Sequence, residues 1–310
     1  MSLASKPPVA LIAGPTASGK SDLALAYAET VNGVIVNADS AQIYADLPIL
    51  SAAPTKDELS RADHRLYGIA DGASGMSAAN WAKLAKHEIS DIHKSGRIPI
   101  LVGGTGLYLQ TLIDGIAPVP AIDPAIRSRV REASLTTNRR LLFKHDFAAA
   151  ERLDASDRTR ISRALEVVLS TGRTLADWQT ERSGGINDLV DILPIVLLPP
   201  RDWLYARCDT RFETMIEAGA MAEVERLLER SLPPDLPVMR AIGVREIAAF
   251  LDGTTTLEAA TAAGKQATRN YAKRQYTWFA HQPPVYWPRF LERLGSSSMA
   301  AALELIRPND

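Results

Sequence analysis

The sequence predicts an α/β protein with a P-loop NTPase-like parallel sheet, flanking helices and an inserted helical domain. Three observations predict this arrangement. Apolar, strand-like runs alternate with helix-like segments over the first 110 residues, which is typical of parallel sheets with crossover helices. A glycine-rich phosphate-loop motif joins the first strand to the first helix. From about residue 118 the chain becomes Arg-rich and helical in pattern, and strand-like sequence returns only at 192–198.

The first strand, 9–13, leads directly into residues 14–21, Gly-Pro-Thr-Ala-Ser-Gly-Lys-Ser, a complete G-x-x-x-x-G-K-[ST] motif. A helix is expected over 19–30. The backbone N–H groups of such a loop surround phosphates, Lys20 supplies a cation, and the Ser21 hydroxyl can bind Mg²⁺. The motif is typical of nucleotide-binding and ATP-binding proteins. Alone, it leaves open whether the phosphate is transferred, hydrolysed or released as a leaving group.

The remaining elements of the first region follow the same alternation. Strands are expected at 34–36 and 98–102, and helices at 78–95 and 105–113. Polar residues follow three of the strands, at 14–16, 37–40 and 103–105. Because ligands collect at the carboxyl ends of parallel strands, these three corners are expected to meet at one crevice.

The domain organisation is read from the prolines and the returning strand. Pro118, Pro120 and Pro124 mark a boundary, and the apolar run 192–198 is expected to rejoin the sheet. The expected domains are therefore a catalytic core made of 1–117 and 186–310, and a helical insertion at 118–185. Within the core, three or four helices are expected over 203–280, and the tail after Pro283-Pro284 is expected to be peripheral.

Composition limits the class of protein. The 310 residues are 46% hydrophobic and 23% charged, with a formal net charge of −1. We find no apolar run near the roughly 18 residues that span a membrane, and the N-terminus has no long apolar segment typical of a secretory signal. Cys208 is the single cysteine, which excludes an intrachain disulfide and a cysteine-based zinc cluster. These features favour a cytoplasmic protein without a membrane partner.

Positive charge is concentrated outside the phosphate-loop region. Residues 121–182 carry 12 Lys/Arg against 9 Asp/Glu and residues 239–290 carry 7 against 3, whereas residues 1–120 carry 9 against 11. A solvated charged face explains such excesses as well as a nucleic acid does. Within 265–281, however, basic and aromatic side chains alternate, a mixture suited to single-stranded RNA; an amphipathic core helix is the equal alternative.

Asp39 is the main candidate for a catalytic acid or base. It follows the strand 34–36 and is expected to face the phosphate-loop crevice, where its carboxylate would accept a proton. The alternative is an aspartate that caps a turn together with Ser40. The strand 98–102 ends in Gly103-Gly104-Thr105, without the acid with which NTP-hydrolysing proteins hold Mg²⁺. This absence favours a small-substrate kinase, or an enzyme that does not hydrolyse nucleotide.

Arginines spaced along predicted helices are candidates for a polyphosphate clamp. Arg160 and Arg163 are three residues apart, and Arg207 and Arg211 are four apart, so each pair shares a helix face. Guanidinium groups placed in this way can hold a departing polyphosphate. Ordinary surface ion pairs are the alternative for each of them.

Five motifs, in this order, resemble the bacterial tRNA dimethylallyltransferases (tRNA isopentenyltransferases) over essentially the full length. They are residues 14–21; Asp39-Ser40 with Gln42-Ile43-Tyr44; Gly103-Gly104-Thr105-Gly106-Leu107-Tyr108; Arg160-Ile161-Ser162-Arg163-Ala164-Leu165-Glu166; and Ala267-Thr268-Arg269 with Ala272-Lys273-Arg274-Gln275 and Thr277-Trp278. The phosphate loop alone is shared by many families, but the series is specific.

The resemblance implies transfer of a dimethylallyl group from dimethylallyl diphosphate to the exocyclic amine of an adenosine. That adenosine lies 3′ to the anticodon in tRNAs that read codons beginning with U, and diphosphate is released. The implied protein is a monomer that grips the anticodon stem-loop with its insertion, and its loop holds the donor diphosphate rather than ATP.

The resemblance also implies roles for individual residues. The implied catalytic residues are Asp39, Lys20 and Thr105, with Mg²⁺ at Ser21. The implied diphosphate-binding residues are Gly14, Pro15, Thr16, Ala17, Ser18, Gly19, Lys20, Ser21, Arg163 and Arg211, with Arg207 as the alternative to Arg211. The implied tRNA-binding residues are Asp39, Ser40, Ala41, Gln42, Thr105, Arg127, Thr159, Arg160, Ile161, Ser162, Arg163, Arg240, Arg245, Lys273, Arg274, Gln275 and Trp278.

One departure from the family pattern is relevant to the site. The family usually has Thr-Ala-Lys-Pro where this chain has Ser51-Ala52-Ala53-Pro54, so no cation is expected from that loop. Three rival functions remain: a relative that prenylates free AMP, a small-molecule kinase, and a non-enzymatic RNA-binding module. The Arg-rich insertion argues against the first, a kinase would need ATP, and a binding module leaves Asp39 and Ser21 unexplained.

Overall fold

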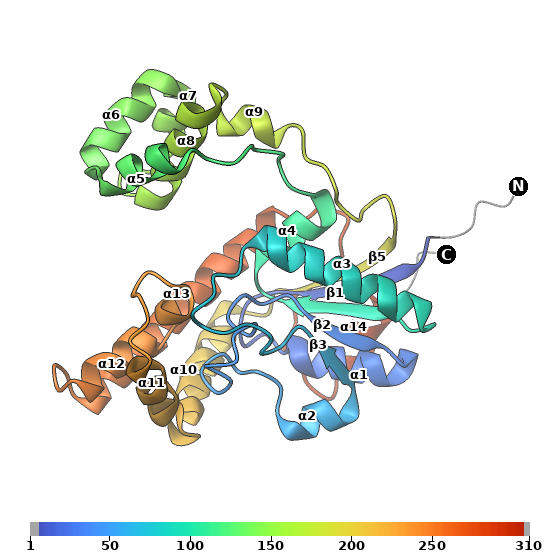
Figure 1. Ribbon diagram of the computed structural model, residues 1–310. Coiled ribbons are helices and arrows are strands. Elements are labelled where there is room, and N and C mark those ends of the chain that lie inside the picture. Colours follow the sequence, from blue (N-terminus) through green and yellow to red (C-terminus); the bar gives the residue numbers. More distant parts are fainter. Residues whose placement is uncertain (1–5, 307–310) are drawn as a thin grey trace, which may run out of the picture. The chain divides into compact units, whose positions relative to one another are not determined.

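Residues 6–306 are described by the computed structural model, and they divide into two compact units. The first unit combines the chain up to Leu112 with the chain from Ile186 onward. Its centre is a six-stranded sheet in the order β3-β2-β4-β1-β5-β6, in which every pairing is parallel (Figure 1). The strands are β1 (Pro8–Ala13), β2 (Val34–Asn37), β3 (Asp63–Arg65), β4 (Pro99–Gly103), β5 (Asp191–Leu197) and β6 (Arg289–Phe290).

The strand order places the expected corners next to one another. β1 lies between β4 and β5, with Ile12 in register with Val102 on one side and Ile195 on the other. β2 pairs with the opposite edge of β4. The segments that follow β1, β2 and β4 therefore leave the same edge of the sheet from neighbouring strands. The return of β5 to the sheet, expected from the apolar run 192–198, is confirmed.

Helices cover both faces of the sheet (Figure 1). They are α1 (Lys20–Val31) with α14 (Met299–Glu304) on one face and α3 (Ala78–Lys94) with α4 (Gly106–Asp114) on the other, while α2 (Lys56–Arg61) precedes β3. The buried ring of Trp81 on α3 stacks on Tyr108 of α4 at 4.6 Å, and its Nε1 donates to Asn37 O at 2.9 Å. This contact fixes the end of β2, two residues before Asp39.

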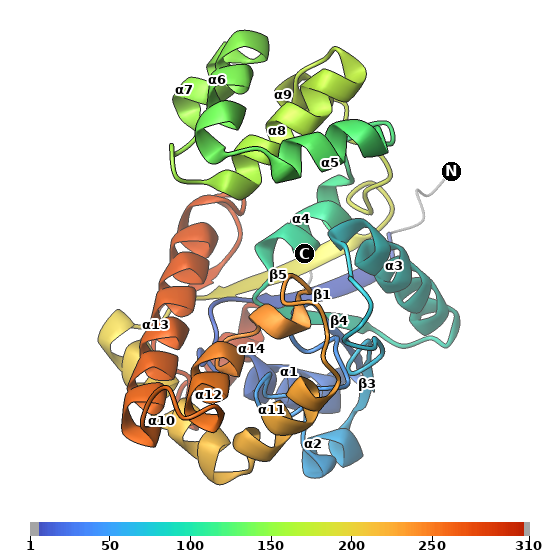
Figure 2. The same ribbon diagram turned by 60° about the vertical axis from the view of Figure 1, so that its left-hand side comes forward.

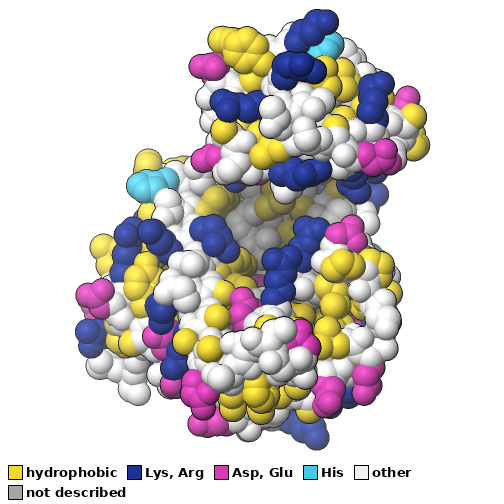
Figure 3. Space-filling view, turned by 90° about the vertical axis from the view of Figure 1, so that its left-hand side faces the viewer, with side chains coloured by type: hydrophobic (Ala, Val, Ile, Leu, Met, Phe, Trp, Pro, Cys, Tyr) yellow, Lys and Arg dark blue, Asp and Glu magenta, His cyan; other side chains and the backbone are white. Residues whose placement is uncertain are grey.

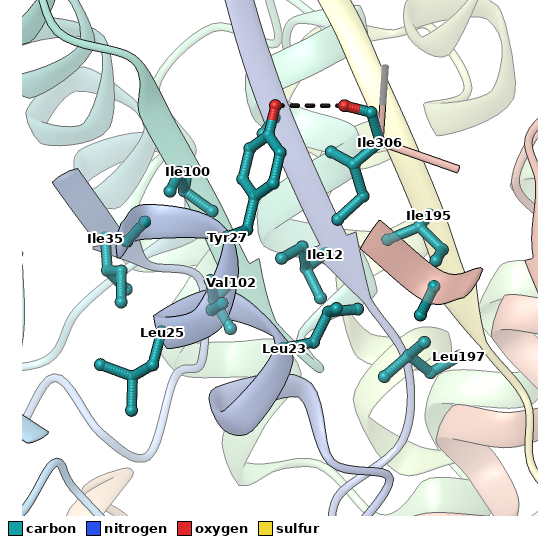
Figure 4. Close-up of a cluster of buried hydrophobic side chains, with 14 of the residues drawn as sticks. Ile12, Leu23, Leu25, Tyr27, Ile35, Ile100, Val102, Ile195, Leu197 and Ile306 are labelled. Carbon is teal, nitrogen blue, oxygen red and sulfur yellow. Dashed lines mark hydrogen bonds between the residues drawn. The ribbon is translucent and has the colours of Figure 1, made fainter. Parts of the chain in front are cut away.

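The main core lies between α1, the sheet and the C-terminal tail (Figure 4). Ile12, Leu23 and Ile100 are fully buried there. Tyr27 Oη donates to the carbonyl oxygen of Ile306 at 3.1 Å, and Ile306 is 1% exposed. The expectation of a peripheral tail was therefore wrong: after Pro283-Pro284 the chain adds β6 beside β5, and the apolar side of α14 completes the core.

Four α-helices and one 3₁₀ turn lie between β5 and β6. They are α10 (Arg201–Glu217), α11 (Ala220–Glu229), the turn Val238–Arg240, α12 (Val244–Leu251) and α13 (Leu257–His281). α13 packs along α10 and α12 (Figure 2). The contact with α10 is close because Gly264 faces the ring of Phe212, where a Cβ would lie 2.0 Å from Cζ. An Arg269–Asp209 ion pair at 2.5 Å joins the same two helices.

The second unit, Ile113–Gly185, consists of helices with a core of their own. Its helices are α5 (Pro124–Glu132), α6 (Leu135–His145), α7 (Phe147–Arg152), α8 (Arg158–Thr171) and α9 (Leu175–Gln179). Each begins at a side-chain cap, the oxygens of Asp123, Ser134, Asp146, Asp157 and Thr174, which accept backbone N–H groups. These caps explain how a short segment divides into five helices. The insertion was expected at 118–185 from its prolines.

The segments that enter and leave the second unit run side by side. Ile116 and Ser183 exchange two backbone hydrogen bonds, of 3.1 and 3.2 Å. Gly115 and Gly185 permit this approach, because a Cβ on either would lie 2.2 Å from a carbonyl oxygen of the neighbouring segment. In the first unit, Ile186 N donates to Leu112 O at 3.0 Å. Among the described helices, none is long and apolar enough to cross a membrane.

Candidate functional site

The phosphate loop occupies the turn from β1 to α1. Gly14 and Gly19 have φ values of 153° and 95°, and Ala17 is left-handed at 62°. Gly14 also has no room for a side chain, because a Cβ would lie 2.6 Å from Leu197 O on the neighbouring strand. α1 begins at Lys20, so its free N–H groups lie at the end of the loop. Lys20 Nζ donates to Pro15 O at 2.6 Å and folds back over the loop.

Lys20 of the loop and Arg211 of α10 are desolvated, and this burial disfavours their positive charges. Burial lowers the pKa of Lys20 to about 8; the Asp39 charge opposes this effect and the Arg211 charge adds to it. Burial also lowers the pKa of Arg211, again against the attraction of Asp39. A site that disfavours its own cations in this way favours an anionic ligand, which would offset their mutual repulsion.

Arg207 and Arg211 both reach the loop from α10. Arg207 Nε donates to Ala17 O at 2.9 Å, and its guanidinium lies 4.8 Å from the Trp203 ring centroid. Arg211 Nη1 donates to Thr16 Oγ1 at 3.3 Å. The sequence left the choice between them open, and the geometry brings both to the loop. Arg163, the other expected clamp residue, belongs to the second unit, so its part in the clamp stays a prediction.

Asp39 combines the two alternatives considered from the sequence. Its Oδ1 accepts the N–H of Ala41 at 2.9 Å, which is the turn-capping arrangement. Asp39 is nevertheless only partly buried and lines a cavity together with Ser40. Thr105, after β4, fixes this corner: its Oγ1 accepts the N–H of Ser40 at 2.9 Å and donates to Ser40 Oγ at 3.2 Å.

Two cavities of the first unit flank Arg211. The first, of about 300 Å³, is lined by Thr16, Asp39, Ser40, Ala41, Tyr44, Leu47, Leu50, Ser51, Met76, Tyr108, Cys208, Arg211, Phe212, Met215, Pro237, Arg240, Ala241, Ile242, Thr268, Tyr271 and Arg274. The second, of about 890 Å³, follows the phosphate loop from Ala17 to Asp22 and the loop 48–56. Arg211 and Met215 line both cavities. Thr16 of the phosphate loop also lines the first cavity, so the loop and Asp39 face the same space.

The first cavity has an apolar wall and a polar side, which includes Asp39, Arg240 and Arg274. Leu47, Leu50 and Phe212 are buried along it. Burial raises the pKa of the Cys208 thiol to about 11, so the single cysteine of the chain stays protonated at neutral pH and is no nucleophile. Burial also raises the pKa of Tyr271, and the Asp39 charge raises it further. The cavity thus suits a flat or aliphatic group, with one carboxylate at its edge.

α13 presents some of its expected tRNA-binding residues and buries another. Lys273 and Arg274 are exposed, whereas Gln275 is only 5% exposed. Trp278 lies flat against Gly106, where a Cβ would be 2.5 Å from the ring. Two of the remaining expected residues of the first unit, Arg240 and Arg245, are exposed.

In the second unit, Lys and Arg side chains are spread over the surface (Figure 3). Of the expected residues there, Arg127, Thr159 and Arg160 are exposed and Ser162 and Arg163 are partly exposed. Ile161, in contrast, is 1% exposed and belongs to the core of the unit. The side chains of Ile161 and Gln275 are therefore buried, unlike those of the other expected residues around them.

A buried glutamate organises three of these arginines. Glu166 on α8 is 5% exposed. Its carboxylate lies 3.9 Å from Arg127, 3.5 Å from Arg131 and 4.0 Å from Arg163. Three guanidinium groups around one carboxylate leave a net positive surface, and Arg131 is a member that the sequence did not single out.

Glu223 on α11 is a site residue that sequence reasoning missed. It is 1% exposed, and its carboxylate oxygens accept the N–H groups of Ile49 and Leu50, both at 2.8 Å. Gln42 holds the same loop through Ser51 O at 3.2 Å and Ala52 O at 2.6 Å. The loop that lacks the family lysine is thus held through its backbone. An acid on an amphipathic helix carries no sequence signal for such a role.

The chain is similar over most of its length to known proteins of one family. Residues 42–282 match the family model described as IPP transferase. The chain is 60% identical over 287 residues to a tRNA dimethylallyltransferase of Sphingopyxis alaskensis, covering 92% of this chain and 94% of that protein. It is 58% identical over 289 residues to the tRNA dimethylallyltransferase of Erythrobacter litoralis, covering 92% and 91%.

Solved structures give the same result. The fold is similar to a full-length tRNA isopentenylpyrophosphate transferase from Bacillus halodurans, with a TM-score of 0.69, 31% identity and coverage of 96% of this chain and 97% of that chain. It is also similar to a eukaryotic dimethylallyltransferase acting on tRNA, with a TM-score of 0.77, 30% identity and coverage of 88% and 69%.

Proposed function

We propose, because the chain belongs to the IPP transferase family, that it transfers a dimethylallyl group from dimethylallyl diphosphate to tRNA. The acceptor is the exocyclic amine of the adenosine 3′ to the anticodon, in tRNAs that read codons beginning with U. The observation that supports this best is the meeting of the phosphate-loop cations and Asp39 beside Arg211, which lines both cavities. The substrate points to the cytoplasm, where the protein would act as a monomer.

The phosphate loop would hold the donor diphosphate as a leaving group. The backbone of residues 17–19, the N-terminus of α1, Lys20 and Arg211 all present positive charge or N–H groups to it. Arg207 and, from the second unit, Arg163 would add to this clamp. These groups stabilise the charge that develops on the diphosphate oxygen as the carbon–oxygen bond breaks, and this step limits an allylic transfer to a weak nucleophile.

A magnesium ion fits the donor set near the loop. The Ser21 side chain is exposed at the start of α1 and lines the second cavity. No group of three or more His, Cys, Asp or Glu residues within 6–306 forms a protein metal cage. This agrees with Mg²⁺, which is usually bound by one or two protein oxygens and by substrate phosphates. Ser21 would hold the ion, which supplies charge neutralisation for the diphosphate.

Asp39 would receive the proton of the attacking amine. The nitrogen forms a bond to the first carbon of the dimethylallyl group, the carbon–oxygen bond breaks, and the amine proton passes to the Asp39 carboxylate. Thr105 keeps this corner in place through Ser40. The adenine must leave its stack to enter the cavity of about 300 Å³, whose wall includes Tyr108 and Tyr271.

The tRNA would be bound by exposed and partly exposed side chains of both units, most of them arginine or lysine. In the first unit these are Arg240, Arg245, Lys273 and Arg274, together with Trp278. In the second unit they are Arg127, Thr159, Arg160, Ser162 and Arg163, arranged in part around Glu166. Such contacts to the backbone make binding strongly dependent on salt.

The test is transfer of a labelled dimethylallyl group to unmodified tRNA in the presence of Mg²⁺ and without ATP. We expect label in the tRNA and release of diphosphate. A requirement for ATP would instead support a small-molecule kinase, and equal transfer to free AMP would support an AMP prenyltransferase. Binding of tRNA without any transfer would support a non-enzymatic RNA-binding module.

A further inference from the structure

α13 has one buried polar side chain next to exposed basic side chains. Lys273 and Arg274 precede Gln275 and are exposed, but Gln275 itself is 5% exposed. A buried amide needs partners for its donor and its acceptor, because an unpaired buried polar group is costly. The amide donates to one backbone group and accepts from another outside its helix, in the loops that form the site.

The Gln275 amide bridges two of the three corners. Its Oε1 accepts the N–H of Thr16, inside the phosphate loop, at 2.8 Å. Its Nε2 donates to Gly104 O, in the segment after β4, at 2.9 Å. One amide group thus holds the loop after β1 at a fixed distance from the loop after β4.

The residues around this hydrogen-bonded bridge leave space for the Gln275 side chain. Gly104 leaves space for the amide, because a Cβ there would lie 2.2 Å from Gln275 Nε2. Two residues on, the Trp278 ring covers Gly106 in the same way. Gln275 and Trp278 are one helical turn apart, so α13 contacts this corner along one of its faces. The bridge is consequently part of a packed contact between α13 and the corner.

Thr16 is hydrogen-bonded both to Gln275 and to the cationic side chain of Arg211. Its N–H is held by Gln275, while its Oγ1 accepts from Arg211. Loss of the amide would release the N–H and leave Thr16 tied only through its side chain. The loop would then lose the fixed geometry on which a close-fitting phosphate cradle depends.

We propose that Gln275 is a positioning residue that sets the shape of the phosphate loop from α13, and that it does not contact tRNA. The inference rests on the proposed function in assigning the loop to the donor diphosphate. It assigns different tasks to neighbouring residues of one helix: Lys273 and Arg274 would face the RNA, while Gln275 maintains the donor site.

The experiment compares Gln275→Met, which keeps the length and removes both hydrogen bonds, with Gln266→Met, an exposed glutamine on the same helix. The affinity for inorganic diphosphate with MgCl₂ is measured by calorimetry, and the affinity for unmodified tRNA is measured by filter binding. The melting temperature of each variant is measured as well, and so is the rate of amide hydrogen exchange in the peptide 14–21. For Gln275→Met we expect diphosphate affinity to fall about tenfold or more. We also expect faster exchange in the loop, tRNA affinity within about twofold, and an unchanged Gln266→Met control.

Unchanged diphosphate affinity in folded Gln275→Met overturns the inference, as does an equal loss of affinity for diphosphate and tRNA. If Gln275→Met does not fold, Gln275→Asn, which keeps a buried amide one methylene shorter, is judged by the same measurements. The diphosphate measurement requires no prenyl transfer. A wild-type protein whose diphosphate affinity depends on Gln275 but that transfers no dimethylallyl group would therefore refute the proposed function and leave the inference standing.

Discussion

Lys20 should make diphosphate binding depend on pH in the range just above neutrality. Burial lowers its pKa to about 8 in the free protein, and only the ammonium form attracts the ligand. The protonated fraction is then about 0.9 at pH 7 and about 0.1 at pH 9. A direct contact between ammonium and phosphate is worth about 4 kcal/mol per unit charge at an effective dielectric constant near 20, so the neutral form contributes little binding. The dissociation constant should therefore rise about tenfold from pH 7 to pH 9.

The assay is titration of inorganic diphosphate into the protein with MgCl₂ at half-unit steps of pH. Lys20→Arg is the matched control, because a guanidinium stays charged over this range and reports only the titration of the ligand itself. We expect the extra loss of affinity in wild type and its absence in Lys20→Arg. A dissociation constant that follows the same pH curve in both proteins would refute the assignment of Lys20 as the titrating cation.

Three further predictions concern other parts of the site. Asp39→Asn keeps an oxygen for the Ala41 N–H and removes the base, so kcat should fall about 10²- to 10⁴-fold with tRNA affinity nearly unchanged; wild-type kcat would exclude a base at this position. Glu223→Gln should lower the free energy of unfolding by about 1–3 kcal/mol, measured by urea denaturation. Burial raises the pKa of Glu223 above its ordinary 4.5. The difference in free energy of unfolding between wild type and Glu223→Gln should therefore shrink as pH rises from 4.5, and a difference that stays constant with pH would contradict the raised pKa. Gly106→Ala should displace Trp278 and weaken tRNA binding in a filter assay, whereas Gly295→Ala, where a Cβ meets nothing within 4 Å, should leave it unchanged; equal affinities would remove Trp278 from the interface.

Most of the sheet and the phosphate loop could be predicted from the local sequence. β1, α1, β2, β4 and β5 all have apolar runs or motif residues that act within a few positions along the chain. β3 and β6 were missed because they are three and two residues long and gain their stability only by pairing at the edges of an existing sheet. Ile306 was missed for a related reason: its burial depends on α1, far away in the sequence.

The residues of the candidate site also fall into two groups, those that the local sequence indicates and those that depend on distant contacts. Asp39 and Lys20 could be proposed from the sequence because each follows a strand or belongs to a motif. Glu223 and the role of Gln275 depend on hydrogen bonds across more than 150 positions of sequence, and no periodicity or spacing reports such bonds. Gln275 was recognised in a motif, and the family resemblance implied a contact with tRNA. Its side chain is buried while Lys273 and Arg274 are exposed, because neighbouring helix residues face different directions.

The paired segments at the base of the second unit have a consequence for how the chain folds. Leu112 and Ile186 are hydrogen-bonded neighbours, although more than 70 residues separate them. Once the helices between them have formed, joining β4 to β5 costs little more loop entropy than closing a tight turn. The sheet can therefore assemble from its two distant halves as if the chain were nearly continuous there. Excision of Ile113–Gly185 with a short glycine linker should accordingly leave a folded, diphosphate-binding core.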